Sequence, residues 1–127
     1  MKQVVLIDDD EISNFVNSQL MLQTRFVDNV HSISSAEDAI RYFGDVDAGK
    51  VPAPDLVFVD IRMPVMDGFT LAQEIMKRYP DLNGEVLFYF LSSSLDPKDI
   101  AKAEATELCS GFLRKPLSKA YLEEIFR

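Results

Sequence analysis

Two kinds of segment alternate along the chain. The first kind is short, apolar and rich in β-branched or aromatic side chains, which is typical of buried strands. Its members are residues 3–7, 26–31, 55–60, 85–91 and 111–115. The second kind carries apolar side chains three and four positions apart, and its members are residues 11–24, 35–43, 68–79, 97–107 and 118–126. The pattern predicts five strand–helix units in succession.

Capping residues mark the ends of the predicted helices. Side chains that can accept a hydrogen bond from a first helical turn precede four of the helices: Asp10, Ser34 or Ser35, Asp96 and Ser118. Gly44 is expected to end the second helix. Residues 44–54 contain glycines, prolines and acids, so we expect a long surface loop there.

The alternation of strands and helices predicts an α/β fold. We expect a five-stranded parallel sheet, doubly wound with helices on both faces, of the flavodoxin-like (βα)5 type. The chain has 127 residues, so a single domain over residues 1–127 is expected. Right-handed crossovers place the carboxyl ends of all strands on one edge of the sheet, and such sheets bind ligands at that edge.

Composition and charge narrow the function classes. The formal net charge of −8 disfavours binding to nucleic-acid phosphates. The single cysteine, Cys109, excludes an internal disulfide and a cysteine zinc cluster, and it fits a reducing compartment. No apolar stretch approaches the ~20 residues that span a bilayer, and the early acids argue against a signal peptide. We expect a cytoplasmic protein that binds neither nucleic acid nor membrane.

Polar side chains follow or close four of the predicted strands. Asp8 and Asp9 follow the first strand and Asp60 closes the third. Ser92 follows the fourth strand and Lys115 closes the fifth. Each residue alone could be a turn, cap, loop or surface residue. Because they are far apart in the sequence but share one expected edge, local turn chemistry does not explain them as a set.

These residue types suit phosphoryl transfer. Converging carboxylates require a cation or a shared proton, and Mg²⁺ prefers oxygen ligands such as carboxylates. A carboxylate can attack phosphorus to form an aspartyl phosphate. A lysine ammonium and a hydroxyl can stabilise the charge of the transferred group.

The other reactive side chains are expected to be structural. His31, the only histidine, is expected to be a polar residue at the end of the second strand. Cys109 is expected to pack in the turn before the fifth strand, and Met63, Met66 and Met76 to pack in the core or against helices.

The most specific stretch is DLVFVDIRMPVMDGFTL, residues 55–71. It resembles the phosphoacceptor segment of the receiver domains of two-component response regulators, in which the acceptor Asp is followed by xxMPxMDG. LIDDDE (6–11) resembles the acidic pair of this family, FLSSS (90–94) the end of its fourth strand, and FLRKP (112–116) its Lys-Pro signature. The resemblance covers essentially the whole chain. Within the family, the sequence is similar to the stand-alone chemotaxis type of receiver domain.

The resemblance implies roles for the matched residues. Asp60 would accept the phosphoryl group, and Lys115 would sense its charge. Mg²⁺ would be bound by Asp9, Asp60 and the backbone carbonyl of Arg62. Asp8 would act mainly through a metal-bound water.

The implied function is a signalling switch or relay that catalyses only its own phosphorylation and dephosphorylation. A sensor histidine kinase or histidine phosphotransfer protein would supply the phosphoryl group. Ser92 would move toward the new anion, and Phe112 would turn into the space that it leaves. The face of the fourth helix, fifth strand and fifth helix would then change its affinity for a downstream protein.

Some positions differ from the commoner family pattern. Ser92 replaces a Thr, and Phe112 stands where Tyr is also frequent. Arg62 and Ser94 lie two residues after the acceptor and the hydroxyl, positions that influence how water reaches an acyl phosphate. The segment 44–54 is an extension relative to compact members.

Two other functions stay open at this point. A Mg²⁺-dependent phosphohydrolase with an Asp nucleophile would use Asp8 and Asp10 as a DxD pair, but it leaves the xxMPxMDG loop without a role. A receiver-like interaction module that never takes up phosphate would not need the full set of site residues.

Overall fold

The computed structural model describes residues 2–93 and 96–127. Ser94 therefore lies outside the described residues. The elements are, in chain order, β1 (Lys2–Ile7), α1 (Glu11–Leu22), β2 (Val27–Ile33), α2 (Ala36–Asp47), β3 (Leu56–Asp60), α3 (Gly68–Arg78), the 3-10 helix η1 (Pro80–Leu82), β4 (Leu87–Ser92), α4 (Pro97–Ala105), β5 (Cys109–Arg114) and α5 (Lys119–Phe126).

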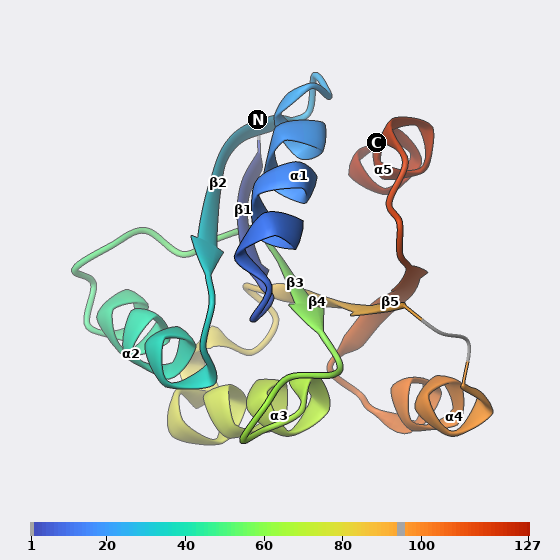
Figure 1. Ribbon diagram of the computed structural model, residues 1–127. Coiled ribbons are helices and arrows are strands. Elements are labelled where there is room, and N and C mark those ends of the chain that lie inside the picture. Colours follow the sequence, from blue (N-terminus) through green and yellow to red (C-terminus); the bar gives the residue numbers. More distant parts are fainter. Residues whose placement is uncertain (1, 94–95) are drawn as a thin grey trace.

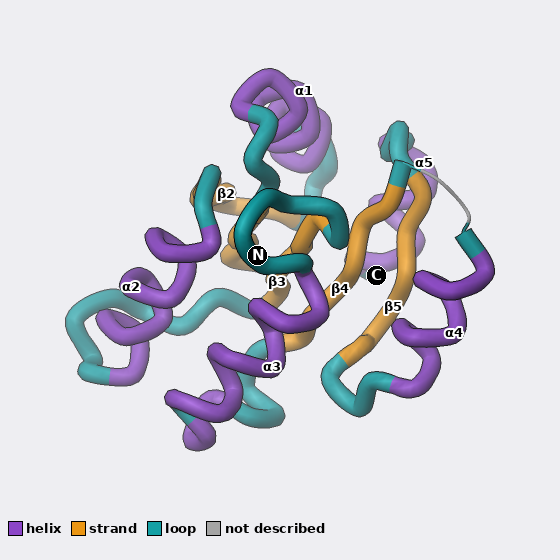
Figure 2. The backbone as a smooth tube through the Cα atoms, turned by 60° about the horizontal axis from the view of Figure 1, so that its bottom comes forward, coloured by secondary structure: helices purple, strands orange, loops and turns teal. Residues whose placement is uncertain are grey.

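The sheet has the predicted doubly wound architecture. All strands pair in parallel, in the order β2-β1-β3-β4-β5. Helices α2, α3 and α4 pack on one face, and α1 and α5 pack on the other (Figures 1 and 2). The chain reverses its direction of winding between β1 and β3, where sheets of this type bind ligands.

Two apolar clusters fill the space between the sheet and its helices. On the α2–α4 face the largest fully buried side chains are Phe43, Phe69, Phe88 and Phe90. On the α1–α5 face they include Leu6, Met21, Phe58 and Leu122. Every residue of β3 is buried, as expected for a central strand covered on both sides. Burying each large apolar side chain of these clusters contributes about 1.5–3 kcal/mol, so the central strands are held firmly.

The predicted N-caps are confirmed. The capping side chains accept hydrogen bonds from the first turns of their helices: Asp10 for α1, Ser35 for α2, Asp96 for α4 and Ser118 for α5. None of the helices in the described part of the chain is long and apolar enough to span a membrane.

The prediction for the end of the second helix was wrong. Helix α2 continues through Gly44 to Asp47, and the backbone N–H groups of Ala48 and Gly49 close its last turn. Gly49 adopts a φ of 75°, the left-handed conformation that ends many helices. Gly44 is instead a point of close approach, because a β-carbon there would lie 2.8 Å from the Tyr79 hydroxyl. The connecting loop is therefore shorter than predicted.

Helix α1 was predicted correctly, but its apolar stripe faces solvent. Ile12 is 77% exposed and Phe15 is 65% exposed. The buried face is formed by Asn14, Asn17 and Met21. Both buried amides donate through Nδ2, Asn17 to Ser13 Oγ and Asn14 to two backbone carbonyls, whereas the Asn14 Oδ1 has no hydrogen-bond partner among the described residues.

The prediction for His31 was wrong in its position. Strand β2 runs two residues beyond it to Ile33, so His31 lies inside the strand. Its exposed ring stacks on Tyr42 of α2, with ring centroids 4.9 Å apart. Cys109 is the first residue of β5, not part of the preceding turn, and it packs against the core as expected. The packing roles of the three methionines are confirmed: Met63, Met66 and Met76.

The start of α3 touches the backbone of Asp60, which gives a first prediction. A β-carbon at Gly68 would lie 2.5 Å from the carbonyl oxygen of Asp60 and 3.0 Å from Val59 Cγ1. Although Ala favours helices by about 1 kcal/mol over Gly, we expect Gly68→Ala to lower the free energy of unfolding by about 1–3 kcal/mol through overpacking. Urea denaturation measures this change.

Gly49→Ala is the matched control for Gly68→Ala. No atom lies within 4 Å of a β-carbon at Gly49, so its substitution tests the positive φ alone. Equal stabilities of Gly68→Ala and the unsubstituted protein would contradict the close approach of α3 to Asp60.

Candidate functional site

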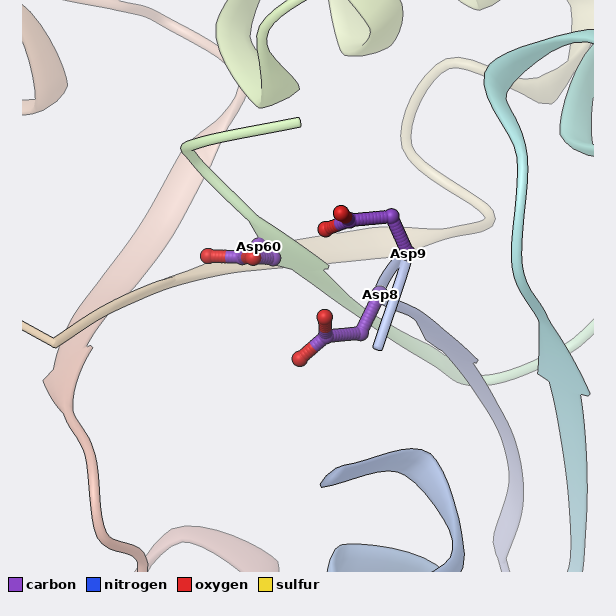
Figure 3. A group of neighbouring side chains, drawn as sticks. All are labelled: Asp8, Asp9 and Asp60. Carbon is purple, nitrogen blue, oxygen red and sulfur yellow. The ribbon is translucent and has the colours of Figure 1, made fainter. Parts of the chain in front are cut away.

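Three carboxylates meet at the carboxyl ends of β1 and β3. Asp8 and Asp9 directly follow β1, and Asp60 is the last residue of β3, its neighbour in the sheet. Their oxygens include three that lie within 4.8 Å of one another (Figure 3). Asp8 is only 1% exposed and Asp60 8% exposed, whereas Asp9 is exposed. The sheet thus brings the predicted acids together at one point.

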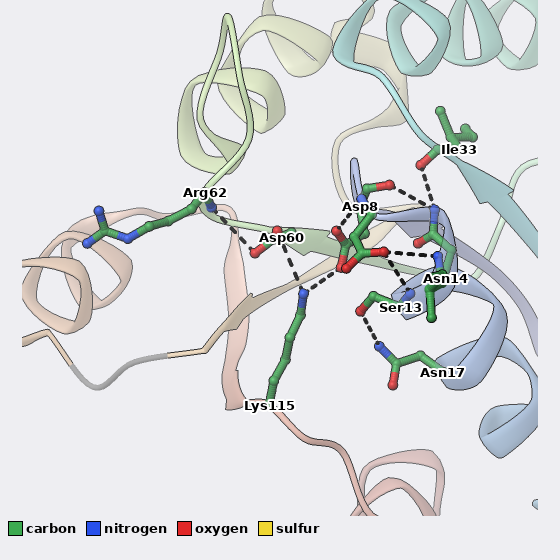
Figure 4. A network of polar contacts seen from close by, with 10 residues as sticks. Asp8, Ser13, Asn14, Asn17, Ile33, Asp60, Arg62 and Lys115 are labelled. Carbon is green, nitrogen blue, oxygen red and sulfur yellow. Dashed lines mark hydrogen bonds and ion pairs between the residues drawn. The ribbon is translucent and has the colours of Figure 1, made fainter.

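Lys115 supplies the positive charge of this cluster. It directly follows β5, and its Nζ lies 2.5 Å from Asp8 Oδ2 and 3.7 Å from Asp60 Oδ2 (Figure 4). Its backbone N–H donates a hydrogen bond to the carbonyl of Ser92, at 2.8 Å. Ser92 is the buried last residue of β4. The strands β1, β3, β4 and β5 therefore each bring a predicted site residue to one edge.

Asn14 holds Asp8 in place, a role that the sequence reasoning missed. Its Nδ2 donates to the carbonyl oxygens of Asp8, at 2.8 Å, and of Ile33, at 3.3 Å (Figure 4). The Asp8 N–H also donates to the Ile33 carbonyl, and the Asp8 side chain accepts from Asp10 N–H. Asn14 thus joins α1 to the ends of β1 and β2. The signal available was a polar residue within a helix that starts directly after the acids.

Arg62 uses its backbone and its side chain in different places. Its N–H donates to Asp60 Oδ1, at 3.4 Å. Its guanidinium extends away from the carboxylates (Figure 4). It donates hydrogen bonds to Asp96 and Asp99 at the start of α4. The role of its carbonyl as a metal ligand stays a prediction.

The surroundings of Asp60 raise its proton affinity. The pKa of the Asp60 carboxyl is raised from the ordinary value of 3.8 to about 6, chiefly by burial. The Lys115 charge lowers this pKa, whereas the charges of Asp8 and Asp9 add to the rise. A cation among these oxygens would replace the proton, because it favours the charged carboxylates. Three converging carboxylates are a donor set of the kind that a hard divalent cation prefers.

Phe112, the predicted switch residue, lies on the edge strand of the sheet. It stands on β5, half-buried against the α2–α4 cluster. Together with Arg114, Lys115, Pro116 and Tyr121 it lines a surface cavity of about 550 Å³ between β5 and α5. Its movement on phosphorylation stays a prediction.

Comparison with known proteins agrees with this geometry. The family model for the response regulator receiver domain matches residues 4–127. A solved two-component response regulator from Cytophaga hutchinsonii superposes with a TM-score of 0.89 and 33% identity, covering 98% of this chain and 92% of that one. The chemotaxis protein CheY of Halobacterium salinarum is 27% identical over 93% of this chain and 88% of its own length.

Fold, site and comparisons together define a receiver domain. The chain belongs to the response regulator receiver family, whose members are phosphorylatable signalling switches of two-component systems. Similar receiver segments also occur in much longer proteins. The sensor kinase CckA of Brucella abortus is 32% identical over 90% of this chain, which spans 11% of that protein.

The raised pKa of Asp60 predicts a pH-dependent cost in stability. Between pH 3.8 and about 6 the folded protein binds more protons than the unfolded one, so its free energy of unfolding falls as the pH rises. Removing the charge with Asp60→Asn should therefore stabilise the protein at pH 7, by about 1–3 kcal/mol. Urea denaturation at several pH values measures this.

At and below pH 4 the advantage of Asp60→Asn should largely disappear, because the wild-type carboxyl is then protonated. Asp28→Asn, at an exposed position of β2, is the control for a general charge effect. A wild-type protein that is as stable as Asp60→Asn at pH 7 would contradict the inferred cost of keeping the Asp60 charge in this buried, acidic environment.

Proposed function

We propose that Asp60 accepts a phosphoryl group from a phosphohistidine, with Mg²⁺ held by Asp9, Asp60 and the Arg62 carbonyl and with Asp8 acting mainly through a metal-bound water. The observation that carries this proposal is the meeting of Asp60 with two other acids and Lys115 at one sheet edge. The chain catalyses only its own phosphorylation and dephosphorylation. The histidine donor belongs to a sensor kinase or a histidine phosphotransfer protein.

The transfer exchanges one bond at phosphorus for another. An Asp60 oxygen attacks phosphorus and forms a P–O bond while the P–N bond of the donor breaks. The imidazole leaves with the electron pair of that bond and takes a proton from solvent. Mg²⁺, when bound, supplies charge neutralisation to the transferred group. Lys115, already beside Asp60, stabilises the same charge, and the Ser92 hydroxyl donates to a phosphoryl oxygen.

The output of the switch lies on the face of α4, β5 and α5. Ser92 ends β4 next to β5, which carries Phe112. Movement of Ser92 toward the phosphoryl group gives Phe112 room to turn inward from the cavity that it lines. The face then changes its affinity for a downstream protein.

The exposed stripe of α1 is suited to the donor protein. Ile12 follows Asp9 by three residues, and Phe15 and Val16 continue the exposed apolar surface along α1. Large apolar side chains held in solvent beside a reactive site support protein docking there. The donor must approach this edge of the sheet to reach Asp60.

Acetyl phosphate with Mg²⁺ tests the acceptor directly. We expect a mass increase of roughly 80 Da on Asp60, as covalent transfer requires, and no increase in Asp60→Asn. Intact-mass and peptide mass spectrometry measure it. Multiple-turnover hydrolysis of phosphate esters would favour the phosphohydrolase instead, and absence of both reactions would favour an interaction module that takes up no phosphate.

Phe15→Ser separates donor docking from chemistry. Once a kinase or phosphotransfer protein that phosphorylates the wild type is identified, this variant should accept phosphate from it at least about 10-fold more slowly, as loss of an interface anchor predicts. Its reaction with acetyl phosphate should be unchanged. Thr70→Ala, at an exposed site on α3, is the control. Equal rates with the protein donor would exclude α1 as the docking surface.

A further inference from the structure

The acceptor loop, residues 61–67 between β3 and α3, is tied to α4 at both of its ends. Arg62 Nη2 lies 3.3 Å from Asp96 Oδ2 and 3.0 Å from Asp99 Oδ2. At the other end, Asp67 Oδ2 lies 3.5 Å from Lys102 Nζ. The two ties have opposite polarity, since the loop contributes the cation to one and the anion to the other. They join the segment after Asp60 to one face of α4.

The ion pairs of Arg62 with Asp96 and Asp99 are weak enough for Arg62 to change partners. The Arg62 side chain is 62% exposed, and exposed ion pairs are weak because water screens them. A surface cavity of about 420 Å³, lined by Arg62, Asp67 and Asp99 among others, leaves the guanidinium room to move. The Asp99 side chain is less exposed, at 16%, and stays with α4.

We propose that Arg62 leaves Asp96 and Asp99 when Asp60 is phosphorylated and pairs with the phosphoryl group. This inference rests on the proposed function. Arg62 lies two residues from the acceptor, and its N–H already donates to Asp60 Oδ1. A guanidinium binds phosphoryl oxygens through paired, charge-assisted hydrogen bonds. The added negative charge attracts Arg62 and repels the two acids of α4.

The exchange loosens the first turn of α4. Asp96 is the N-cap of this helix, and its carbonyl accepts from the N–H groups of Asp99 and Ile100, at 3.0 and 3.1 Å. Without Arg62, the two acids of this turn lose their shared counter-charge. Phosphorylation is thus transmitted to α4 through the acceptor loop, in addition to the path through Ser92 and Phe112.

A double-mutant cycle with beryllofluoride and Mg²⁺ tests the exchange. Beryllofluoride mimics a phosphoryl group on a carboxylate. The variant Asp96→Asn/Asp99→Asn keeps the N-cap but frees Arg62, so it should bind beryllofluoride about two- to five-fold more tightly, the scale of an exposed ion pair. In an Arg62→Gln background the same two substitutions should change the affinity little. Calorimetry measures the four affinities.

Glu104→Gln is the control for net charge, because Glu104 is an exposed acid at the other end of α4. Equal tightening by Glu104→Gln, or equal tightening with and without Arg62, would overturn the exchange. Failure of every variant to bind beryllofluoride would instead contradict the proposed function.

Hydrogen exchange gives a second readout. In the wild type, beryllofluoride should speed exchange of the Asp99 and Ile100 amides. In Asp96→Asn/Asp99→Asn, which has no acids in this turn to lose a counter-charge, beryllofluoride should leave the exchange of these amides unchanged. Unchanged protection of these amides in the wild type would also overturn the proposal.

Discussion

The convergence of the Asp8, Asp9 and Asp60 carboxylates is the constraint on which the rest of the site depends. Buried like charges repel, and a single lysine compensates them only in part. The surrounding structure holds the acids together against this repulsion. Buried apolar side chains hold β1 and β3 side by side in the sheet. Asn14 donates a hydrogen bond to the backbone carbonyl of Asp8 and holds it in place. A cation bound among these carboxylates would relieve the same repulsion.

The packing of α3 and α4 extends this constraint beyond the carboxylates. Gly68 lets α3 start in contact with the Asp60 backbone, so β3 cannot shift without moving a helix. The acceptor loop, residues 61–67, forms ion pairs with side chains of α4. A change of charge at Asp60 therefore acts on elements that are already in contact with it.

Much of the fold could be predicted because its signals are local. Strands covered on both sides have continuous apolar runs. An N-cap such as Asp96 bonds only to the first turn of the helix that follows it, so it can be predicted from neighbouring residues. The spacing of the apolar residues in α1 predicted a helix but did not show which of its faces meets the sheet, because the face that packs is formed by Asn14, Asn17 and Met21. Gly44 was wrongly predicted to end a helix, because a glycine is needed there for the close approach of Tyr79, which is distant in the sequence. Asp8, Asp60 and Lys115 could be placed together because parallel strands share one carboxyl edge, whereas the contacts of Asn14 and the Arg62 side chain depend on how helices dock.

In α1 the residues that pack on the sheet and the large apolar residues lie on different faces of the helix. Asn14, Asn17 and Met21 secure it to the domain, so its outward side chains contribute little to folding. Those outward positions are free to diverge during evolution while the scaffold persists. In duplicated copies of such a domain, substitutions at these positions would change the outer surface of the helix while the scaffold stays folded.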